Sequence, residues 1–322
     1  MKVLRGVVGR LPLPLVNYTS PAMTSALRAL VKARKFDLVH FDSIHMMPYE
    51  HLFGGTPVIY NWHNIESELM RRYAETAPLS RRAVASVTAR KIEAAERYIL
   101  RSAFGHVVCS GRERDALAAI ASGARVTVVH NGVDLSGFAR GSAEGRRFRL
   151  VFVGSMNYHA NSDAGLWFAR EVWPAVRERH PEWRLTLVGS NPPPAVVALR
   201  EQLGIEVTGT VTDVKPYYRE ALAAIVPLRT GGGTRLKILE AMAASVPVVS
   251  TELGAEGLPV ISGENLLLVK NRTQWLEALE AVTGDAEVRS GLIRAARATV
   301  AAFDWEVLGQ SLFETYRGWL LL

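Results

Sequence analysis

Short apolar runs rich in β-branched residues alternate along this chain with longer amphipathic stretches. Parallel strands are buried on both faces and are joined by helical crossovers, so this alternation predicts an α/β fold with parallel sheets. The runs form two series. The first lies at residues 37–41, 57–61, 106–109 and 125–129, and the second at residues 149–153, 184–188, 205–208, 223–227, 246–250 and 266–269.

The length of 322 residues predicts two domains, because single domains usually have about 100 to 200 residues. A segment rich in glycine and polar residues, 130–147, separates the two series and is the predicted linker. We expect a first domain at 1–135, a second at 136–303 and a final helix at 304–322 that packs back toward the first. Helical periodicity recurs near the end of the chain, at residues 272–284, 286–302 and 305–322.

The net charge of +7 raises the question of an anionic partner. Nucleic acid is disfavoured, because basic residues alternate with acidic ones in segments such as 90–97 (RKIEAAER). The helical stretch 71–101 is rich in arginine, which suits either a solvated helix face or a peripheral contact with an anionic membrane.

The chain carries no recognisable targeting or membrane-spanning segment. Lys2, Arg5 and Arg10 interrupt the apolar core that a signal peptide needs, and no apolar run approaches the roughly 20 residues of a membrane span. The single cysteine, Cys109, excludes internal disulfides and is expected to be a buried, inert thiol. We expect a cytoplasmic protein, peripheral at the inner face of the membrane at most.

Segment 227–243 (PLRTGGGTRLKILEAMA) has the pattern of an anion site. A strand ends, Gly231, Gly232 and Gly233 follow, and a helix is expected to begin near Thr234. Glycines let the backbone approach a phosphate, and a helix start presents unpaired N–H groups. A plain tight turn is the alternative, because neither a Walker loop nor a complete dinucleotide fingerprint is present.

Charged residues strengthen this interpretation. Arg235 and Lys237 add positive charge at the helix start. Glu240 lies one turn beyond Lys237, where a carboxylate can accept hydrogen bonds from ribose hydroxyls. The set suits a nucleoside diphosphate, although Lys237 and Glu240 could instead pair with each other on the surface.

A second loop, FVGSMNYHAN at 152–161, follows another buried strand. A ligand could approach Gly154 closely, or the segment could be an ordinary turn whose helix is capped by Asn161 or Ser162. In the first half, His63 follows a strand, where its side chain would face the cleft, although a lone histidine is usually structural. No His-Glu-x-x-His and no Gly-x-Ser-x-Gly motif occurs, so neither a metal site nor serine hydrolysis is expected.

An ordered series of motifs resembles the family-four retaining glycosyltransferases of the GT-B fold over nearly the whole chain. These motifs are VVHNGVD at 128–134, RLVFVGSM at 149–156, GTVTDV at 209–214, LEAMA at 239–243 and VPVVS at 246–250. The resemblance implies two Rossmann-like domains facing a cleft, with donor binding in the second domain.

The resemblance also implies roles for individual residues. His63, Lys237 and Glu240 correspond to the catalytic set, with Lys237 on the diphosphate, Glu240 on the ribose and Arg235 assisting. The donor site would further include Gly154, Ser155, Gly231, Gly232, Gly233 and Thr234. The donor would be a nucleoside diphosphate sugar and the acceptor a glycan or lipid-linked hydroxyl, with neither an obligatory metal nor a further cofactor.

Three positions depart from the family pattern. Gly232 stands where the family often has a glutamate, which removes one side-chain contact to the sugar. Ser245 replaces a glycine and is expected to tighten or displace the helix end. Anything resembling residues 36–41 is normally preceded by a strand with a glycine-rich loop and a further α/β unit, so the first domain is expected to be incomplete.

These patterns favour transfer of a hexose-like group with retention of configuration, in polysaccharide or glycoconjugate synthesis. Two alternatives remain open. One is a non-catalytic or degenerate fragment that binds a sugar nucleotide, motivated by Gly232 and the late start of the first domain. The other is a sugar-nucleotide epimerase of the same fold.

Overall fold

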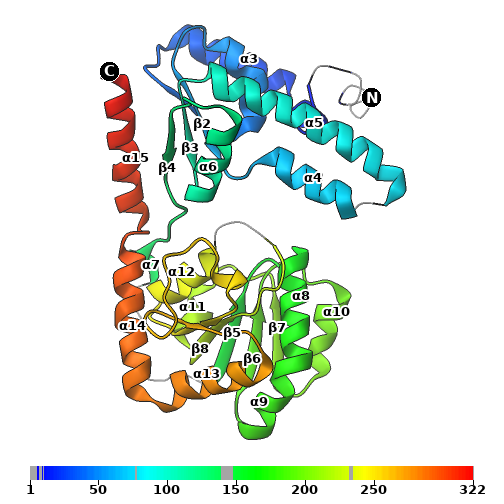
Figure 1. Cartoon of the computed structure of the whole chain (residues 1–322), viewed down its shortest axis with the longest axis vertical. Helices are drawn as coiled ribbons and strands as arrows, with labels where there is room; N and C mark the ends of the chain where they lie inside the picture. Colours follow the sequence, from blue (N-terminus) through cyan, green and yellow to red (C-terminus); the bar gives the residue numbers. More distant parts are fainter. Residues whose placement is uncertain are drawn as a thin grey trace. The chain divides into compact units, whose positions relative to one another are not determined.

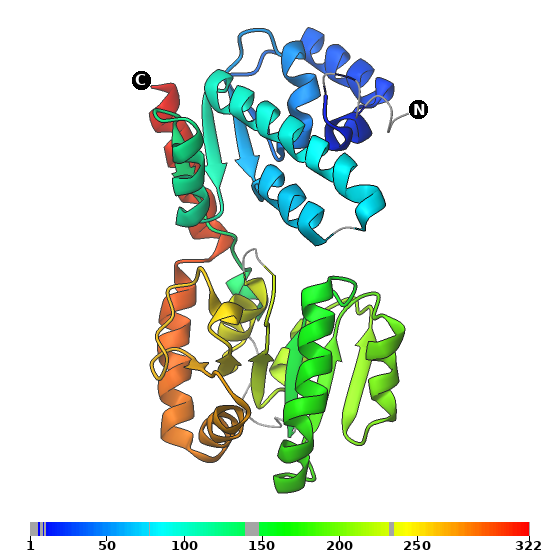
Figure 2. The same ribbon diagram turned by 45° about the vertical axis from the view of Figure 1, so that its right-hand side comes forward.

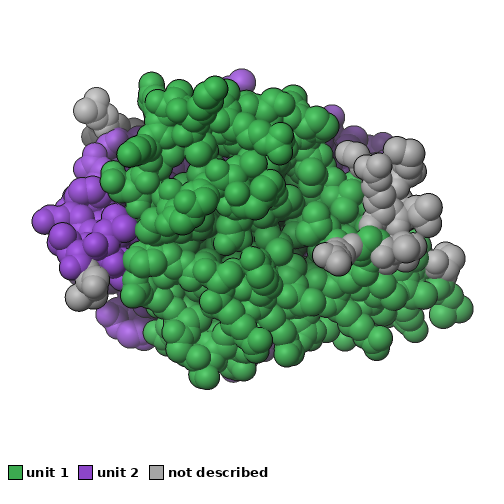
Figure 3. All heavy atoms as spheres, turned by 90° about the horizontal axis from the view of Figure 1, so that it is seen from above, with its two compact units in different colours: residues 1–130 green, residues 131–322 purple. Residues whose placement is uncertain are grey.

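The computed structural model describes residues 6, 9, 11–76, 78–138, 148–231 and 235–321. The chain divides into two compact units, Met1–His130 and Asn131–Leu322, which Figure 3 colours separately. Each unit is built on its own parallel sheet, so the α/β fold expected from the sequence is confirmed. The predicted domain limits at residues 135 and 303, and the return of the last helix toward the first domain, stay predictions.

Within the described residues, the first unit has a four-stranded parallel sheet in the order β1-β2-β3-β4. The strands are β1 (Val39–Phe41), β2 (Val58–Trp62), β3 (Gly105–Val108) and β4 (Val126–Val128). Val39 pairs with Val58, and Tyr60 pairs with His106. Every residue of β3 is buried, as expected for a parallel strand covered on both faces.

Helices flank this sheet (Figures 1 and 2). They are α2 (Leu13–Tyr18), α3 (Pro21–Ala33), the 3₁₀ helix η1 (Ile44–Leu52), α4 (Glu66–Thr76), α5 (Leu79–Ser102) and α6 (Gly111–Ile120). Cys109 lies at the end of β3 and is buried, as predicted.

The basic stretch 71–101 is helical, as predicted, and consists of two helices, α4 and α5, which lie side by side in Figures 1 and 2. The break comes at Pro78, the N-cap of α5, because a proline ring is excluded from the interior of a helix. Some of the arginines are paired: Arg97 Nη2 lies 2.7 Å from Glu93 Oε1. Among the described helices, none combines the length and the low charge that crossing a membrane requires.

The second unit has a six-stranded parallel sheet within the described residues, in the order β10-β9-β8-β5-β6-β7. Its strands are β5 (Arg149–Val153), β6 (Arg184–Val188), β7 (Ile205–Gly209), β8 (Ala223–Val226), β9 (Val248–Ser250) and β10 (Leu267–Leu268). The chain runs outward from β5 to β7, returns to place β8 beside β5, and continues outward on the other side. Ligands of such sheets bind at the carboxyl ends of the strands where the order reverses, here β5 and β8.

The helices of the second unit pack around a core that contains buried Phe152, Phe168 and Trp275. The first group comprises α7 (Leu135–Phe138), α8 (His159–Trp167), η2 (Phe168–Val172), α9 (Trp173–Arg179), α10 (Pro194–Val197), η3 (Ala198–Glu201) and α11 (Lys215–Arg219). The second comprises α12 (Leu236–Ala243), η4 (Leu253–Ala255), α13 (Arg272–Gly284), α14 (Ala286–Ala301) and α15 (Trp305–Leu320). The predicted linker therefore contains helix α7, and its residues 139–147 lie outside the described residues.

Local sequence explains where several of these helices begin. Side-chain oxygens of Asn271, Asp285 and Asp304 accept hydrogen bonds from the first-turn N–H groups of α13, α14 and α15. The π-helical turn η2 ends at Val172, two residues before Pro174, whose ring nitrogen cannot donate to a carbonyl in the preceding turn.

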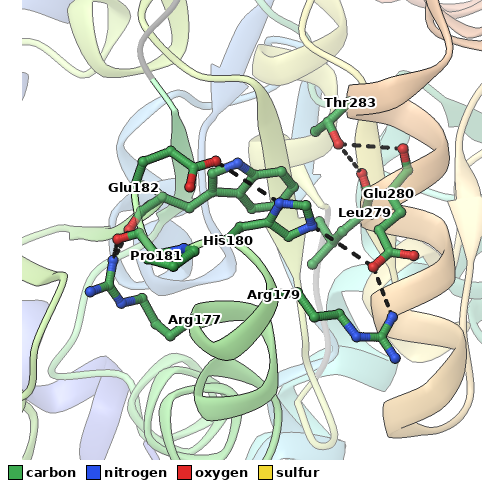
Figure 4. A network of polar contacts seen from close by, with 9 residues as sticks. Arg177, Arg179, His180, Pro181, Glu182, Leu279, Glu280 and Thr283 are labelled. Carbon is green, nitrogen blue, oxygen red and sulfur yellow. Dashed lines mark hydrogen bonds and ion pairs between the residues drawn. The ribbon is translucent and has the colours of Figure 1, made fainter.

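A polar network fastens the end of α9 to α13 (Figure 4). The ring of His180 stacks on Trp183 with centroids 4.1 Å apart, and Arg179 Nη1 donates to Glu280 Oε1 at 2.8 Å. His180 Nε2 lies 3.8 Å from the same Glu280 oxygen. The residues after His180 lead into β6, which begins at Arg184, so this network lies at the amino end of that strand. Ligands of such sheets bind at the opposite edge, where the strands have their carboxyl ends.

Candidate functional site

Two glycine loops meet at the carboxyl ends of β5 and β8. A Cβ added to Gly154 would lie 2.9 Å from Lys237 Nζ and 2.8 Å from Asn161 Nδ2, so this backbone lies directly against the lysine. Gly231 has φ +102, and a Cβ there would lie 2.9 Å from the Tyr158 hydroxyl. Only glycine fits both positions without displacement of a neighbour. Gly232, Gly233 and Thr234 lie outside the described residues.

Lys237 is half-buried in the first turn of α12, beside the end of β5. Its Nζ donates to Asn161 Oδ1 at 2.6 Å and lies 4.6 Å from the centroid of the Phe152 ring. Burial, and next the nearby Arg235 guanidinium, lower the pKa of Lys237 to about 7 against the opposing effect of the Glu240 carboxylate. An ammonium in this environment gains stability from an added anion.

Glu240 lies one turn beyond Lys237 on the same helix, as predicted, and is bonded to a residue that the sequence did not single out. The Tyr218 hydroxyl, on α11, is placed to donate to Glu240 Oε2 at 3.0 Å and to the carbonyl oxygen of Lys237 at 3.1 Å. Burial raises the pKa of Glu240, while the Tyr218 hydrogen bond and the Lys237 charge lower it. Burial first, and then the neighbouring Glu240, raise the pKa of Tyr218.

Arg235 is the N-cap residue of α12, and only 3% of it is exposed. Its Nη2 donates to the carbonyl oxygen of Gly231 at 3.3 Å and lies 3.6 Å from Glu256 Oε2. Burial lowers the pKa of Arg235, and Glu256 and Tyr158 partly restore it. The guanidinium thus holds the backbone at Gly231. That Arg235 assists Lys237 in binding a phosphate stays a prediction.

The loop after β5 is held by side chains from the first turn of α8. Asn161 Nδ2 donates to the Ser155 carbonyl at 2.8 Å, and Ser162 Oγ donates to the Met156 carbonyl. Neither residue caps the helix, because α8 begins at His159 and its N-cap is Tyr158, which makes no side-chain capping bond. The capping interpretation was therefore wrong. The Ser155 hydroxyl is exposed and lies 2.7 Å from Asn157 Oδ1 and 2.9 Å from Ser190 Oγ.

Helix α12 ends where the sequence pattern places it, despite Ser245. Val246 N donates to the Ala241 carbonyl and Ser245 N to the Met242 carbonyl, the two bonds of a Schellman motif. Ser245 adopts φ +58, a left-handed conformation that favours glycine. Whether Ser245 tightens or displaces the helix end relative to the family stays a prediction.

His63 follows β2 at the carboxyl edge of the first sheet. Its Nε2 lies 2.8 Å from the carbonyl oxygen of Asp42 and 3.3 Å from Asp42 Oδ1, and Asn61 Nδ2 donates to the same carboxylate oxygen at 2.7 Å. Burial raises the pKa of nearby Glu66, while the charges of His45 and His63 lower it. This edge therefore presents clustered polar groups at the position predicted for His63.

Sequence reasoning missed the partners of the predicted residues. Asp42, Tyr218 and Glu256 carried no motif signal, and Asn161 was considered only as a cap. Among the described residues, no group of three or more histidine, cysteine, aspartate or glutamate side chains could hold a metal ion. A hollow of about 780 Å³ in the first unit is lined by Pro57 and Phe104, which precede β2 and β3, and does not include His63.

Comparisons with known proteins agree with this geometry. Residues 147–285 match the model of "Glycosyl transferases group 1", and residues 1–136 match "Glycosyltransferase Family 4". The chain is 26% identical to a glycogen synthase of Mycobacterium tuberculosis over 250 residues, 72% of this chain and 58% of the relative. It is 30% identical to a D-inositol 3-phosphate glycosyltransferase of Kribbella flavida over 60% of this chain and 51% of the relative. The chain thus spans little more than half the length of these curated relatives.

Solved structures share the fold at low sequence identity. Sucrose-phosphate synthase from Thermosynechococcus elongatus has a TM-score of 0.71 and 19% identity, covering 92% of this chain and 77% of its own. HepE from Anabaena, in complex with UDP and glucose, has a TM-score of 0.69 and 15% identity, covering 92% and 81%. The two segments matched by family models together span most of the chain, which belongs to the group 1, family 4 glycosyltransferases of the GT-B fold.

Proposed function

We propose that this protein transfers a hexose-like sugar from a nucleoside diphosphate sugar to a hydroxyl acceptor, with retention of configuration. The observation that carries the proposal is the half-buried Lys237 ammonium against the Gly154 backbone, where the strand order of the sheet reverses. A second cation, Arg235, lies close enough to lower the pKa of Lys237. Buried cations that repel each other are stabilised when an anion binds between them or beside them.

In this proposal the diphosphate binds at Lys237 and the uncapped starts of α8 and α12, which both present N–H groups near the two glycine loops. Glu240, held by Tyr218, accepts hydrogen bonds from the ribose hydroxyls. As the sugar leaves, negative charge grows on the diphosphate, and the fixed positive charges stabilise it. His63 belongs to the first unit and is proposed to contact the transferred sugar.

UDP-glucose is the first donor to test, because HepE from Anabaena, a neighbour in fold, has been crystallised with it. Calorimetric titration with UDP-glucose and a panel of other nucleotide sugars should give saturable binding. Incubation with glycan and lipid-linked acceptors, followed by NMR of the product, should give a glycoside with the anomeric configuration of the donor. An inverted product would refute retention.

The same assays separate the alternatives. Binding without transfer or hydrolysis would identify a non-catalytic sugar-nucleotide-binding protein. Conversion of the nucleotide sugar without any acceptor would identify an epimerase. No binding of any nucleotide sugar would reject the donor site itself.

We also propose a cytoplasmic protein whose hairpin of α4 and α5 contacts an anionic membrane peripherally, as suits a lipid-linked acceptor. Apolar side chains stand exposed there beside arginines, with Leu79 83% and Tyr73 45% exposed. Sedimentation with phosphatidylserine vesicles at low salt, but not at high salt, is the expected result. Equal binding to neutral vesicles would contradict it.

A further inference from the structure

Asn161 connects the two loops of the candidate donor site. It is buried in the first turn of α8, with 7% of its surface exposed. Its Oδ1 accepts from Lys237 Nζ at 2.6 Å, and its Nδ2 donates to the Ser155 carbonyl at 2.8 Å. The amide orientation follows from chemistry, because an ammonium only donates and a carbonyl only accepts. One side chain therefore joins the loop after β5 to the helix after β8.

We propose that Asn161 is the positioning residue of Lys237. In the absence of donor, its amide oxygen holds the ammonium over the Gly154 backbone. Its amide nitrogen holds the loop after β5 in the position at which a diphosphate binds. This inference rests on the proposed function, in which Lys237 contacts the diphosphate.

The physical argument starts from the short supply of hydrogen-bond acceptors around the lysine. The Phe152 ring lies on one side of Nζ, and its face attracts a cation but accepts no ordinary hydrogen bond. Glu240 is on the same helix, and its carboxylate is already hydrogen-bonded by Tyr218. Without the Asn161 oxygen, the charged form of Lys237 would lose its neutral acceptor in a buried site, where an unsatisfied ammonium is costly.

Other charged groups face the lysine from neighbouring elements. Arg235, at the start of α12, repels the ammonium, Glu240 attracts it, and Glu256 lies beyond Arg235 near η4. Tyr218, on α11, acts through Glu240. Asn161 differs from the charged groups because it is neutral, and from Tyr218 because it accepts a hydrogen bond from the ammonium directly, so it can orient Lys237 without competing with an incoming diphosphate for charge.

Ser162 provides a matched control within the same turn. Its hydroxyl donates to the Met156 carbonyl, so Ser162→Ala also removes a tether between α8 and the loop but leaves the hydrogen bond between Asn161 and Lys237 in place. A purely structural role of Asn161 would make Asn161→Ala resemble Ser162→Ala. A positioning role would change the lysine only in the Asn161 variants.

The first experiment needs no ligand. The pKa of Lys237 is read from the pH titration of its ¹³Cε resonance, assigned by its absence in Lys237→Met. Asn161→Ala should lower this pKa, because the ammonium loses its acceptor, and Asn161→Asp should raise it, because a carboxylate is added. Ser162→Ala should leave it unchanged. Equal pKa values in Asn161→Ala and Ser162→Ala would overturn the proposal.

The second experiment measures the Kd of UDP-glucose at pH 6 and pH 8. Asn161→Ala should weaken binding about tenfold at pH 8, equivalent to about 1.4 kcal/mol, and less at pH 6, where the lysine is charged in any case. Asn161→Asp should weaken binding at both pH values, because its carboxylate repels the diphosphate. A loss in Asn161→Ala that is the same at both pH values would refute positioning.

The two experiments also separate this inference from the proposed function. If wild-type protein does not bind UDP-glucose or any other nucleotide sugar while the Lys237 pKa responds as expected, Asn161 positions the lysine and the donor assignment fails. If donor binds and the Lys237 pKa does not respond, the donor assignment stands and the role of Asn161 fails.

Discussion

The half-buried Lys237 should make the proposed binding of a donor depend on pH, and the size of the effect can be calculated from its pKa. The pKa of Lys237 is about 7 instead of 10.5. At about 1.4 kcal/mol for each pKa unit, the charged form is destabilised by about 5 kcal/mol relative to that of a free lysine side chain. A diphosphate interacts with the charged form, so binding should be accompanied by proton uptake above pH 7.

The expected size follows from the protonated fraction of Lys237. With a pKa of about 7, that fraction falls from about one half at pH 7 to about one eleventh at pH 8, so the Kd of UDP-glucose should rise about fivefold. UDP-glucose is preferable to free UDP here, because its diphosphate is doubly esterified and keeps its charge over this range.

The assay is isothermal titration calorimetry at several pH values, in buffers that differ in ionisation enthalpy. Lys237→Met should weaken binding about tenfold or more at pH 7 and remove both the proton uptake and this pH dependence. Lys270→Met is the matched control, because Lys270 is 70% exposed and paired with Glu252. Unchanged affinity in Lys237→Met, or an unchanged pH dependence, would refute the reasoning.

Three further substitutions test the site and its frame. Gly154→Ala should weaken UDP-glucose binding about tenfold or more, because its Cβ would displace Lys237 Nζ and Asn161. Gly291→Ala is the control, because a Cβ there meets nothing within 4 Å. It should retain affinity and raise the free energy of unfolding, measured by chemical denaturation, by roughly 0.5 to 1 kcal/mol. Glu240→Gln should weaken UDP-glucose but leave competition by inorganic pyrophosphate unchanged, and an equal effect on both would place Glu240 away from the ribose. Ser245→Gly should stabilise the protein by about 1 kcal/mol, since it removes left-handed strain at φ +58, and a lower melting temperature would contradict this.

The strands were predictable because hydrophobic runs are a local signal. Each of the ten expected strands has a counterpart, and β5 and β6 begin and end at the predicted residues. Helices α13 to α15 were equally readable, because Asn271, Asp285 and Asp304 cap them through short-range bonds. The break between α4 and α5 also has a local signal, because Pro78 cannot lie in the interior of a helix.

The site was predictable only in part, because partners distant in sequence carry no local pattern. The positions of Lys237 and Glu240 one turn apart follow from helix geometry, but their contacts with Asn161 and Tyr218 depend on how strands are ordered in the sheet. Asn161 near a helix start resembles a cap in sequence, and only the placement of β8 beside β5 brings Lys237 to it. For the same reason, the contacts of Arg235 with Glu256 and of His63 with Asp42 could not be predicted from the sequence.

The reversal of strand order also decides when the ligand pocket can exist during synthesis. The loop after β5 leaves the ribosome early, yet its neighbour from β8 follows only after β6 and β7 have been made. A nascent chain ending at Gly209 would hold one wall of the pocket and lack Lys237 altogether. A ligand of this site therefore cannot assist the first steps of folding of this unit and can stabilise it only once α12 has docked.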